Sequence, residues 1–108
     1  MRKSEEKQAL LFYENTILEA LKDVESSLVA YYNEGDKLKS IEAEVLAKKE
    51  IATLEKNKYD TGLSNEIIYL ENEKYYLEKR IKEIESKRTL ANNLIALYKA
   101  LGGGASEG

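Results

Sequence analysis

The sequence predicts an all-α protein, a long antiparallel two-helix coiled-coil hairpin that oligomerises as a fragment of an α-helical barrel. Three observations support this fold class. The 108 residues contain no proline, apolar residues recur at alternating spacings of three and four, and turn-forming residues gather at one internal place, 60–65. Helices of such length are typical of coiled coils, because ordinary globular helices run about 8 to 20 residues.

The first helix is expected from about residue 4 to residue 59. One face carries Leu10, Tyr13, Ile17, Leu21, Val24, Leu28 and Tyr31, and the same face is widened by Leu11, Leu18 and Tyr32. After a three-residue slip near Gly35, the pattern resumes at Leu38, Ile41, Val45, Ala52, Glu55 and Tyr59. A slip of this kind overwinds a supercoil locally, so we expect a bend or a change of partner there.

The turn is expected at residues 60–64. Gly62 can adopt the left-handed backbone that ends a helix, and Ser64 is the candidate N-cap of the next helix. In that register Leu63 and Ile68 would occupy the two positions of a hydrophobic staple.

The second helix, expected at about 65–101, carries two neighbouring heptad seams. The first seam is Ile67, Leu70, Lys74, Leu77, Ile81, Ile84, Arg88, Ala91, Ile95 and Tyr98. The second seam is Tyr69, Glu73, Tyr76, Arg80, Glu83, Lys87, Leu90, Leu94, Leu97 and Leu101. A helix with two apolar seams needs two neighbours, and a lone hairpin supplies one. We therefore expect the isolated chain to self-associate, because an exposed apolar patch at Leu90, Leu94, Leu97 and Leu101 would have little to pack on.

The end of the chain is expected to be a flexible tail. Four of the six glycines fall in the last seven residues, and Gly102 resembles Gly62 as a helix stop. The predicted hairpin domain is 1–104, with the flexible tail at 102–108.

Composition argues against several classes of function. With 17 basic and 20 acidic residues the net charge is −3, which gives no electrostatic reason to expect nucleic acid as a partner. The absence of cysteine and histidine removes the thiolate and imidazole ligands of metals and the commonest general base. We expect no enzyme activity, no metal and no cofactor. The charged opening "MRKSEEKQALLF" does not resemble a secretion signal.

Three stretches of the chain resemble one family, the TolC-like outer-membrane efflux proteins. "FYENTILEALKDVESSLVAYYNE" (12–34) resembles the helix that follows that family's β-strands, and "KNKYDTGLSNEIIYLENEKYYLEKR" (56–80) resembles its periplasmic tip and returning helix. "LIALYKALGGG" (94–104) is similar to its C-terminal signature. The three motifs come in the family's order and at about its spacing.

The resemblance implies a place in a larger assembly. Family members are homotrimers in which an outer-membrane β-barrel continues into a periplasmic tunnel of twelve helical strands. The tunnel works with a periplasmic adaptor (membrane fusion) protein and an inner-membrane transporter. This chain would be the second helical hairpin, a soluble fragment of an outer-membrane and periplasmic parent that lacks its strands, and "ASEG" may be foreign to it.

The resemblance also points to individual residues. The tip that would dock the adaptor comprises Tyr59, Thr61, Gly62, Leu63 and Ser64. Ser64 stands where some members carry an arginine, which puts an arginine-based latch in doubt. Glu71 matches one of two acidic positions that ring the tunnel entrance in some members, and the other position is Ile68. A simpler interpretation is that Gly62 only permits a turn and that Glu71 lies on a solvated face.

A second hypothesis needs no tunnel. An unrelated coiled-coil hairpin could act as a protein-interaction or spacer arm. Such an arm would share the turn and the hairpin, but it would have no use for a second seam on the returning helix.

Overall fold

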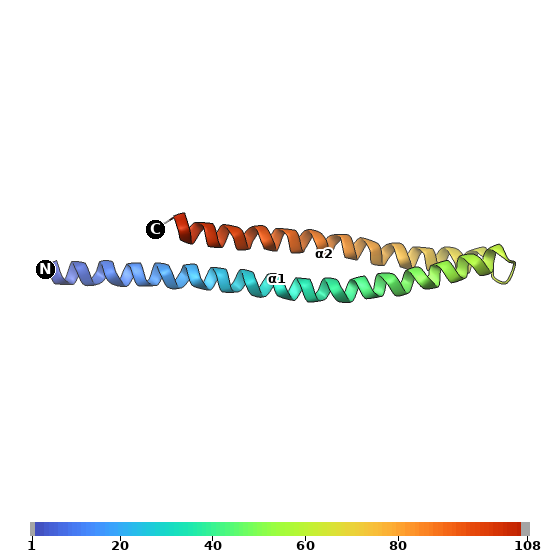
Figure 1. Cartoon of the computed structure of the whole chain (residues 1–108), viewed down its shortest axis with the longest axis horizontal. Coiled ribbons are helices and arrows are strands. Elements are labelled where there is room, and N and C mark those ends of the chain that lie inside the picture. Colours follow the sequence, from blue (N-terminus) through green and yellow to red (C-terminus); the bar gives the residue numbers. More distant parts are fainter. Residues whose placement is uncertain (1, 107–108) are drawn as a thin grey trace. The chain divides into compact units, whose positions relative to one another are not determined.

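Two long helices make up residues 2–106, the part of the chain that the computed structural model describes (Figure 1). Helix α1 is Arg2–Asp60 and helix α2 is Glu66–Ser106. They run in opposite directions from the turn at 61–65, and the described residues contain no strand. The predicted all-α helical hairpin is confirmed.

The ends of the helices at the turn lie within a residue of the prediction, but the far end of α2 does not. Helix α2 continues to Ser106, so the prediction that it stops at Leu101 is wrong. Among the described residues positive φ occurs at Gly62 and not at Gly102. Glycine lowers helix stability by about 1 kcal/mol without forbidding helical geometry, and no proline follows to end the helix. Residues 107 and 108 of the predicted tail lie outside the described residues.

The chain divides into two compact units. One is Glu34–Leu90, and the other combines Met1–Asn33 with Ala91–Gly108. The division on α1 falls beside Gly35, where the sequence pattern slips by three residues.

The unit Glu34–Leu90 has a narrow core on one face of α1. Leu38, Ile41, Val45 and Ala52 are buried there, as the heptad spacing predicts. The burial on α2 falls on Tyr69, Tyr76, Glu83 and Ser86, of which the first three are half-buried and Ser86 is 3% exposed. The core is therefore aliphatic on α1 and largely polar or aromatic on α2.

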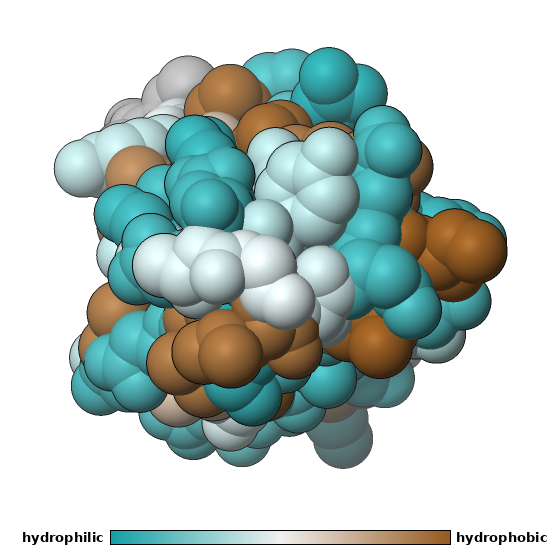
Figure 2. Space-filling view, turned by 90° about the vertical axis from the view of Figure 1, so that its right-hand side faces the viewer, coloured by the Kyte–Doolittle hydropathy of each residue, from teal (hydrophilic) through white to brown (hydrophobic). Residues whose placement is uncertain are grey.

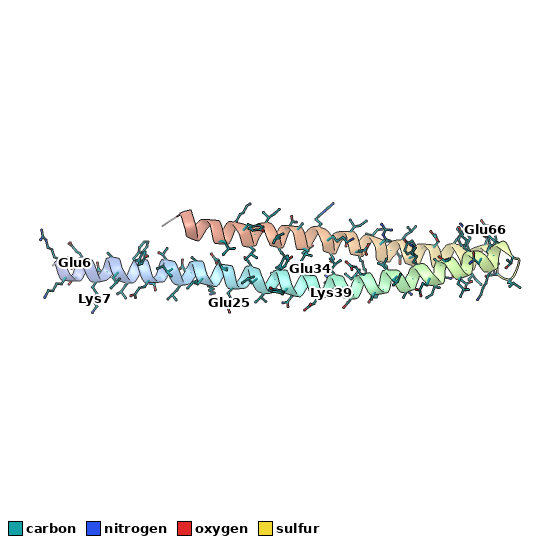
Figure 3. All side chains as sticks on the ribbon, viewed as in Figure 1. Glu6, Lys7, Glu25, Glu34, Lys39 and Glu66 are labelled. Atoms are coloured by element: carbon teal, nitrogen blue, oxygen red, sulfur yellow. The ribbon has the colours of Figure 1, made fainter. Side chains whose placement is uncertain are left out.

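Polar contacts between the two helices accompany this core. Ser86 Oγ donates to Glu34 Oε1 at 2.7 Å, and Glu34 lies between the helices (Figure 3). Lys79 Nζ donates to Glu44 Oε2 at 2.6 Å. This hydrogen bond, with the charge of Lys79, lowers the pKa of the Glu44 carboxyl. The stabilisation is thus present above the carboxyl's unfolded pKa and is lost as the pH falls through the lowered value.

The other unit also pairs the two helices. Asn93 Nδ2 donates to the carbonyl of Ala30 at 3.2 Å. The side chains that are half-buried in this unit include Val24, Ser27 and Tyr31 of α1 and Leu94, Leu97 and Ala100 of α2. Nearer the start of α1 the predicted apolar face is exposed, with Leu10 at 56% and Tyr13 at 62%.

The two seams of α2 are used in the opposite way from the prediction. Leu90, Leu94 and Leu97, expected to have little to pack on, are half-buried. The more apolar first seam is exposed instead, for example Leu77 at 51% and Ile81 at 56%. The polar contacts made by Lys79, Ser86 and Asn93 explain the choice, because these groups find partners on α1 only when the second seam faces it.

Candidate functional site

The turn at the tip of the hairpin is a complete Schellman motif. The N–H of Gly62 donates to the carbonyl of Tyr59 at 3.1 Å, and the N–H of Leu63 donates to the carbonyl of Lys58 at 2.7 Å. Gly62 has a φ of 80°, the left-handed conformation that the motif requires. The predicted left-handed role of Gly62 is confirmed.

Leu63 is the exposed apolar residue of this tip. The residue after the left-handed glycine usually packs on an apolar side chain in the last turn of the helix, but the corresponding position here is Lys58. Leu63 is accordingly 80% exposed. The space-filling view onto the turn end of the hairpin shows apolar groups lying among polar ones (Figure 2).

Side chains brace the turn from beneath. The Glu55 carboxylate accepts from Ser64 Oγ at 3.3 Å and lies 3.5 Å from Lys58 Nζ. Tyr59 stacks on Tyr69 with ring centroids 5.5 Å apart. Together these contacts tie the end of α1 to the start of α2, so the tip presents Leu63 from a braced frame.

The N-cap of α2 is Asn65, and the prediction of Ser64 is wrong. Asn65 Oδ1 accepts from the N–H of Ile68 at 3.0 Å, whereas the Ser64 hydroxyl is turned toward Glu55. With the cap one residue later, the two staple positions become 64 and 69. Leu63 and Ile68 therefore do not form the predicted staple.

Removing this cap is expected to destabilise the chain. Asn65→Ala should lower the free energy of unfolding by about 1 kcal/mol, because an N–H at the start of α2 loses its acceptor. Denaturant unfolding followed by circular dichroism measures the change. Ser64→Ala is the matched control, since it removes one exchangeable hydroxyl contact and leaves the cap. A larger loss for Ser64→Ala would contradict the assignment.

The structure brings four of the five predicted tip residues into one network and leaves Leu63 outside it. Thr61 Oγ1 donates to the carbonyl of Asn57 at 2.9 Å, while Tyr59, Gly62 and Ser64 make the contacts given above. Glu71 is exposed on α2, and a tunnel-lining role for it stays a prediction.

A second candidate surface, which we call the α2 stripe, runs along the outside of α2. It consists of exposed residues at heptad spacing: Ile67, Leu70, Lys74, Leu77, Ile81, Ile84, Arg88, Ala91, Ile95 and Tyr98. The large apolar members are 51–67% exposed. Heptad seams of this kind pack knobs into holes against another helix, so the α2 stripe has the pattern of a surface that a helix covers.

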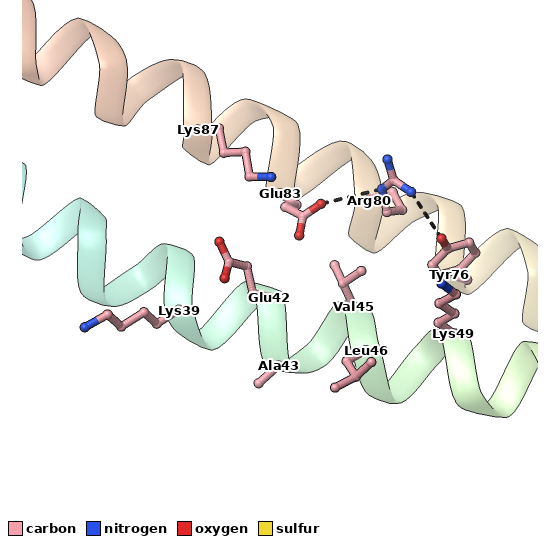
Figure 4. A pocket seen from close by; sticks show the side chains of 10 residues that line it. All are labelled: Lys39, Glu42, Ala43, Val45, Leu46, Lys49, Tyr76, Arg80, Glu83 and Lys87. Atoms are coloured by element: carbon pink, nitrogen blue, oxygen red, sulfur yellow. Dashed lines mark hydrogen bonds and ion pairs between the residues drawn. The ribbon is translucent and has the colours of Figure 1, made fainter.

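A groove of about 690 Å³ lies between the helices in the unit Glu34–Leu90 (Figure 4). Arg80 crosses its wall, with Nη1 donating to Tyr76 Oη at 3.2 Å and Nε 3.5 Å from Glu83 Oε1. The sequence analysis missed this network, although the spacing of these residues by four and three was a signal for it. Its lining residues are Lys39, Glu42, Ala43, Val45, Leu46, Lys49, Tyr76, Arg80, Glu83 and Lys87. Such an open, mixed surface differs from an enclosed apolar ligand pocket.

Neither metal binding nor membrane crossing is indicated for the described part of the chain. Among residues 2–106 no three potential ligands of the His, Cys, Asp or Glu type come together as a metal site. The helices of the same residues include no segment that is both long and apolar enough to traverse a bilayer.

Comparison with known proteins places this hairpin among efflux components. A family model described as "Outer membrane efflux protein" matches residues 2–103. Outer membrane protein OprJ of Pseudomonas aeruginosa is 30% identical over 100 residues, which cover 93% of this chain and 21% of OprJ. The chain thus spans about a fifth of that relative's length. No solved structure matches it.

Proposed function

The chain belongs to the outer membrane efflux protein family, and on that premise we propose that it is a wall segment of a periplasmic tunnel. The tunnel would be part of an oligomeric efflux channel, a homotrimer in the longer protein. Its role is structural and conductive, and it involves no catalysis.

The α2 stripe is the observation that carries this proposal. In a ring of helices every member has two lateral neighbours, and α2 has two seams. One seam is half-buried in the hairpin, and the other exposes Leu70, Leu77, Ile81 and Ile84 to between 51% and 56%. Covering a side chain of this size stabilises by about 1.5–3 kcal/mol, which supplies the drive for a second neighbour.

The angle between the two seams supports a curved wall. Each residue of a coiled-coil helix advances by about 103°, so the centre of the α2 stripe lies roughly 155° around α2 from the seam that is half-buried. Neighbours on opposite sides at 180° would give a flat layer. A deficit of about 25° per helix closes a ring of roughly 14 helices, which is close to the twelve that the family resemblance implies.

The tip is the part of the hairpin that we propose docks the periplasmic adaptor. Leu63 supplies an exposed apolar anchor, and Gly62 allows another backbone to approach closely because it has no Cβ. No atom outside its immediate neighbours lies within 4 Å of the position a Cβ would take at Gly62. The docking region is then Tyr59, Thr61, Gly62, Leu63 and Ser64.

The wider assembly follows from the same proposal. The longer protein would lie in the outer membrane and the periplasm and would reach an inner-membrane transporter through the adaptor. Glu71 would line the tunnel near its entrance, where a ring of carboxylates attracts cations and repels anions. A free-standing spacer arm is the weaker hypothesis, because it leaves the α2 stripe without a partner.

A substitution in the α2 stripe tests the wall proposal. In an efflux protein carrying this hairpin, Ile81→Lys should reduce assembled channels and export at least about tenfold, because it places a charge in a helix–helix contact. Assembly is measured by native electrophoresis of purified protein, and export by retention of a fluorescent efflux substrate.

Glu78→Lys is the matched control for that substitution. Glu78 is exposed on the same helix three residues away, but it lies outside the α2 stripe. The control should assemble and export normally. Equal behaviour of the two variants would refute a role for the α2 stripe in the wall.

A further inference from the structure

We infer that the α2 stripe packs against the outer face of α1 in a second copy of this chain, at the same height and in antiparallel orientation. The inference rests on the proposed wall role, and it adds the identity of the neighbour and the residue pairs that select it. The argument is confined to the unit Glu34–Leu90.

The outer face of α1 carries a stripe of its own, which we call the α1 stripe. Its members are all exposed: Asp36, Lys39, Ala43, Leu46 and Glu50. Ala43 and Leu46 point away from α2, whereas Val45 points toward it (Figure 4). Asp36, Ala43 and Glu50 recur at seven-residue intervals, on the side of α1 opposite the buried core.

The two stripes have matching charge patterns. The α2 stripe has cations at Lys74 and Arg88, separated by 14 residues, and the α1 stripe has carboxylates at Asp36 and Glu50 with the same separation. Among the described residues, the ion pairs include a contact of Lys74 with Glu78 at 3.9 Å and none made by Arg88, Asp36 or Glu50. Three of these four charges are therefore free to meet a partner.

The register of the hairpin brings these charges level with one another. Lys79 is paired with Glu44, and Lys48 Nζ lies 5.8 Å from the centre of the Tyr75 ring. Counting from those contacts along antiparallel helices, position 74 is level with position 50 and position 88 with position 36. A second hairpin standing at the same height therefore sets Lys74 beside Glu50 and Arg88 beside Asp36.

The apolar residues between the charges match as well. In the same register Leu77 meets Leu46 and Ile81 meets Ala43, so a large side chain faces a similar one and then a small one. Ile84 meets Lys39, whose aliphatic stem can cover apolar surface while its ammonium stays in water. The contact thus has an apolar centre with an ion pair at each end.

The charges also exclude the alternatives. Two α2 stripes packed antiparallel about Ile81 would set Lys74 beside Arg88, and two α1 stripes about Ala43 would set Asp36 beside Glu50. Like charges at such positions are a known means of selecting one coiled-coil partner over another. The pattern therefore favours α2 on α1 over either helix on its own copy.

Charge reversal on one helix at a time tests this pairing. We compare Lys74→Glu with Arg88→Glu as one double variant, and Asp36→Lys with Glu50→Lys as another, by sedimentation at micromolar concentration. Each variant alone should associate at least about tenfold more weakly than the unchanged chain, because every contact now sets like charges together. An equimolar mixture should recover association, because the two variants complement each other at both of their stripes.

A charge-matched control separates pairing from net charge. Lys82→Glu with Lys99→Glu changes the total charge by the same amount at exposed positions of α2 outside the stripe, and it should associate like the unchanged chain. Circular dichroism of every variant checks that the helices persist. Equal weakening by this control, or no recovery in the mixture, would overturn the inference.

A monomeric unchanged chain would also overturn it. In that case the second copy is not the neighbour, while the wall role itself is judged separately by Ile81→Lys in the longer channel. Recovery by mixing, together with normal behaviour of the control, would establish the α2-to-α1 contact.

Discussion

Replacing Leu63 by aspartate is expected to abolish export by an efflux protein that carries this hairpin, without unfolding the tip. Leu63 is 80% exposed, so within the hairpin the change removes little packing. Loss of an apolar anchor from the centre of a docking interface costs about 2 kcal/mol or more, which is roughly thirtyfold in affinity. Adaptor binding, export and thermal unfolding should be measured on the same variant.

Leu63→Met is the control for that prediction. Methionine keeps an apolar side chain of similar volume, so binding and export should stay near normal. The opposite pattern, in which Leu63→Asp unfolds the tip but still binds adaptor, would mean that Leu63 serves the turn alone. Normal export by a stable, assembled Leu63→Asp channel would refute the docking role.

Gly62→Val is expected to have the largest effect on the stability of the turn. The residue has a φ of 80°, and a β-branched side chain in left-handed backbone costs on the order of 1–2 kcal/mol. Because nothing lies within 4 Å of the added Cβ, the loss reports the backbone and not a clash. Denaturant unfolding of the 108-residue chain measures it.

Gly102→Val is the matched control, because Gly102 lies in α2 and also has nothing within 4 Å of an added Cβ. Valine has a better helix propensity than glycine, so this variant should be unchanged or slightly more stable. Equal stability of the two variants would show that the left-handed conformation of Gly62 costs nothing to replace.

The sequence was sufficient to predict the helices, the position of the turn and the core of α1. Those features depend on neighbours in the chain: the absence of proline, the freedom of Gly62, and the heptad spacing of Leu38, Ile41 and Val45. The N-cap was misassigned because Ser64 and Asn65 are adjacent and both can cap a helix. The contact of Ser64 with Glu55, nine residues away, leaves the cap to Asn65.

Which seam of α2 faces α1 could not be read from spacing alone. Both seams have helical periodicity, and the first is the more apolar. The choice accompanies contacts between residues far apart in sequence, such as Ser86 with Glu34 across 52 positions and Lys79 with Glu44 across 35. Periodicity identifies that a surface will be covered, but it does not identify by what.

The exposure of the more apolar seam has a consequence for how this chain behaves before it meets its neighbours. A lone hairpin keeps its polar contacts inside and its best hydrophobic surface in water, so much of its folding free energy is deferred to assembly. Its melting temperature then depends on protein concentration, because association stabilises the folded state by mass action. Newly made chains are correspondingly open to proteolysis and aggregation until they are incorporated.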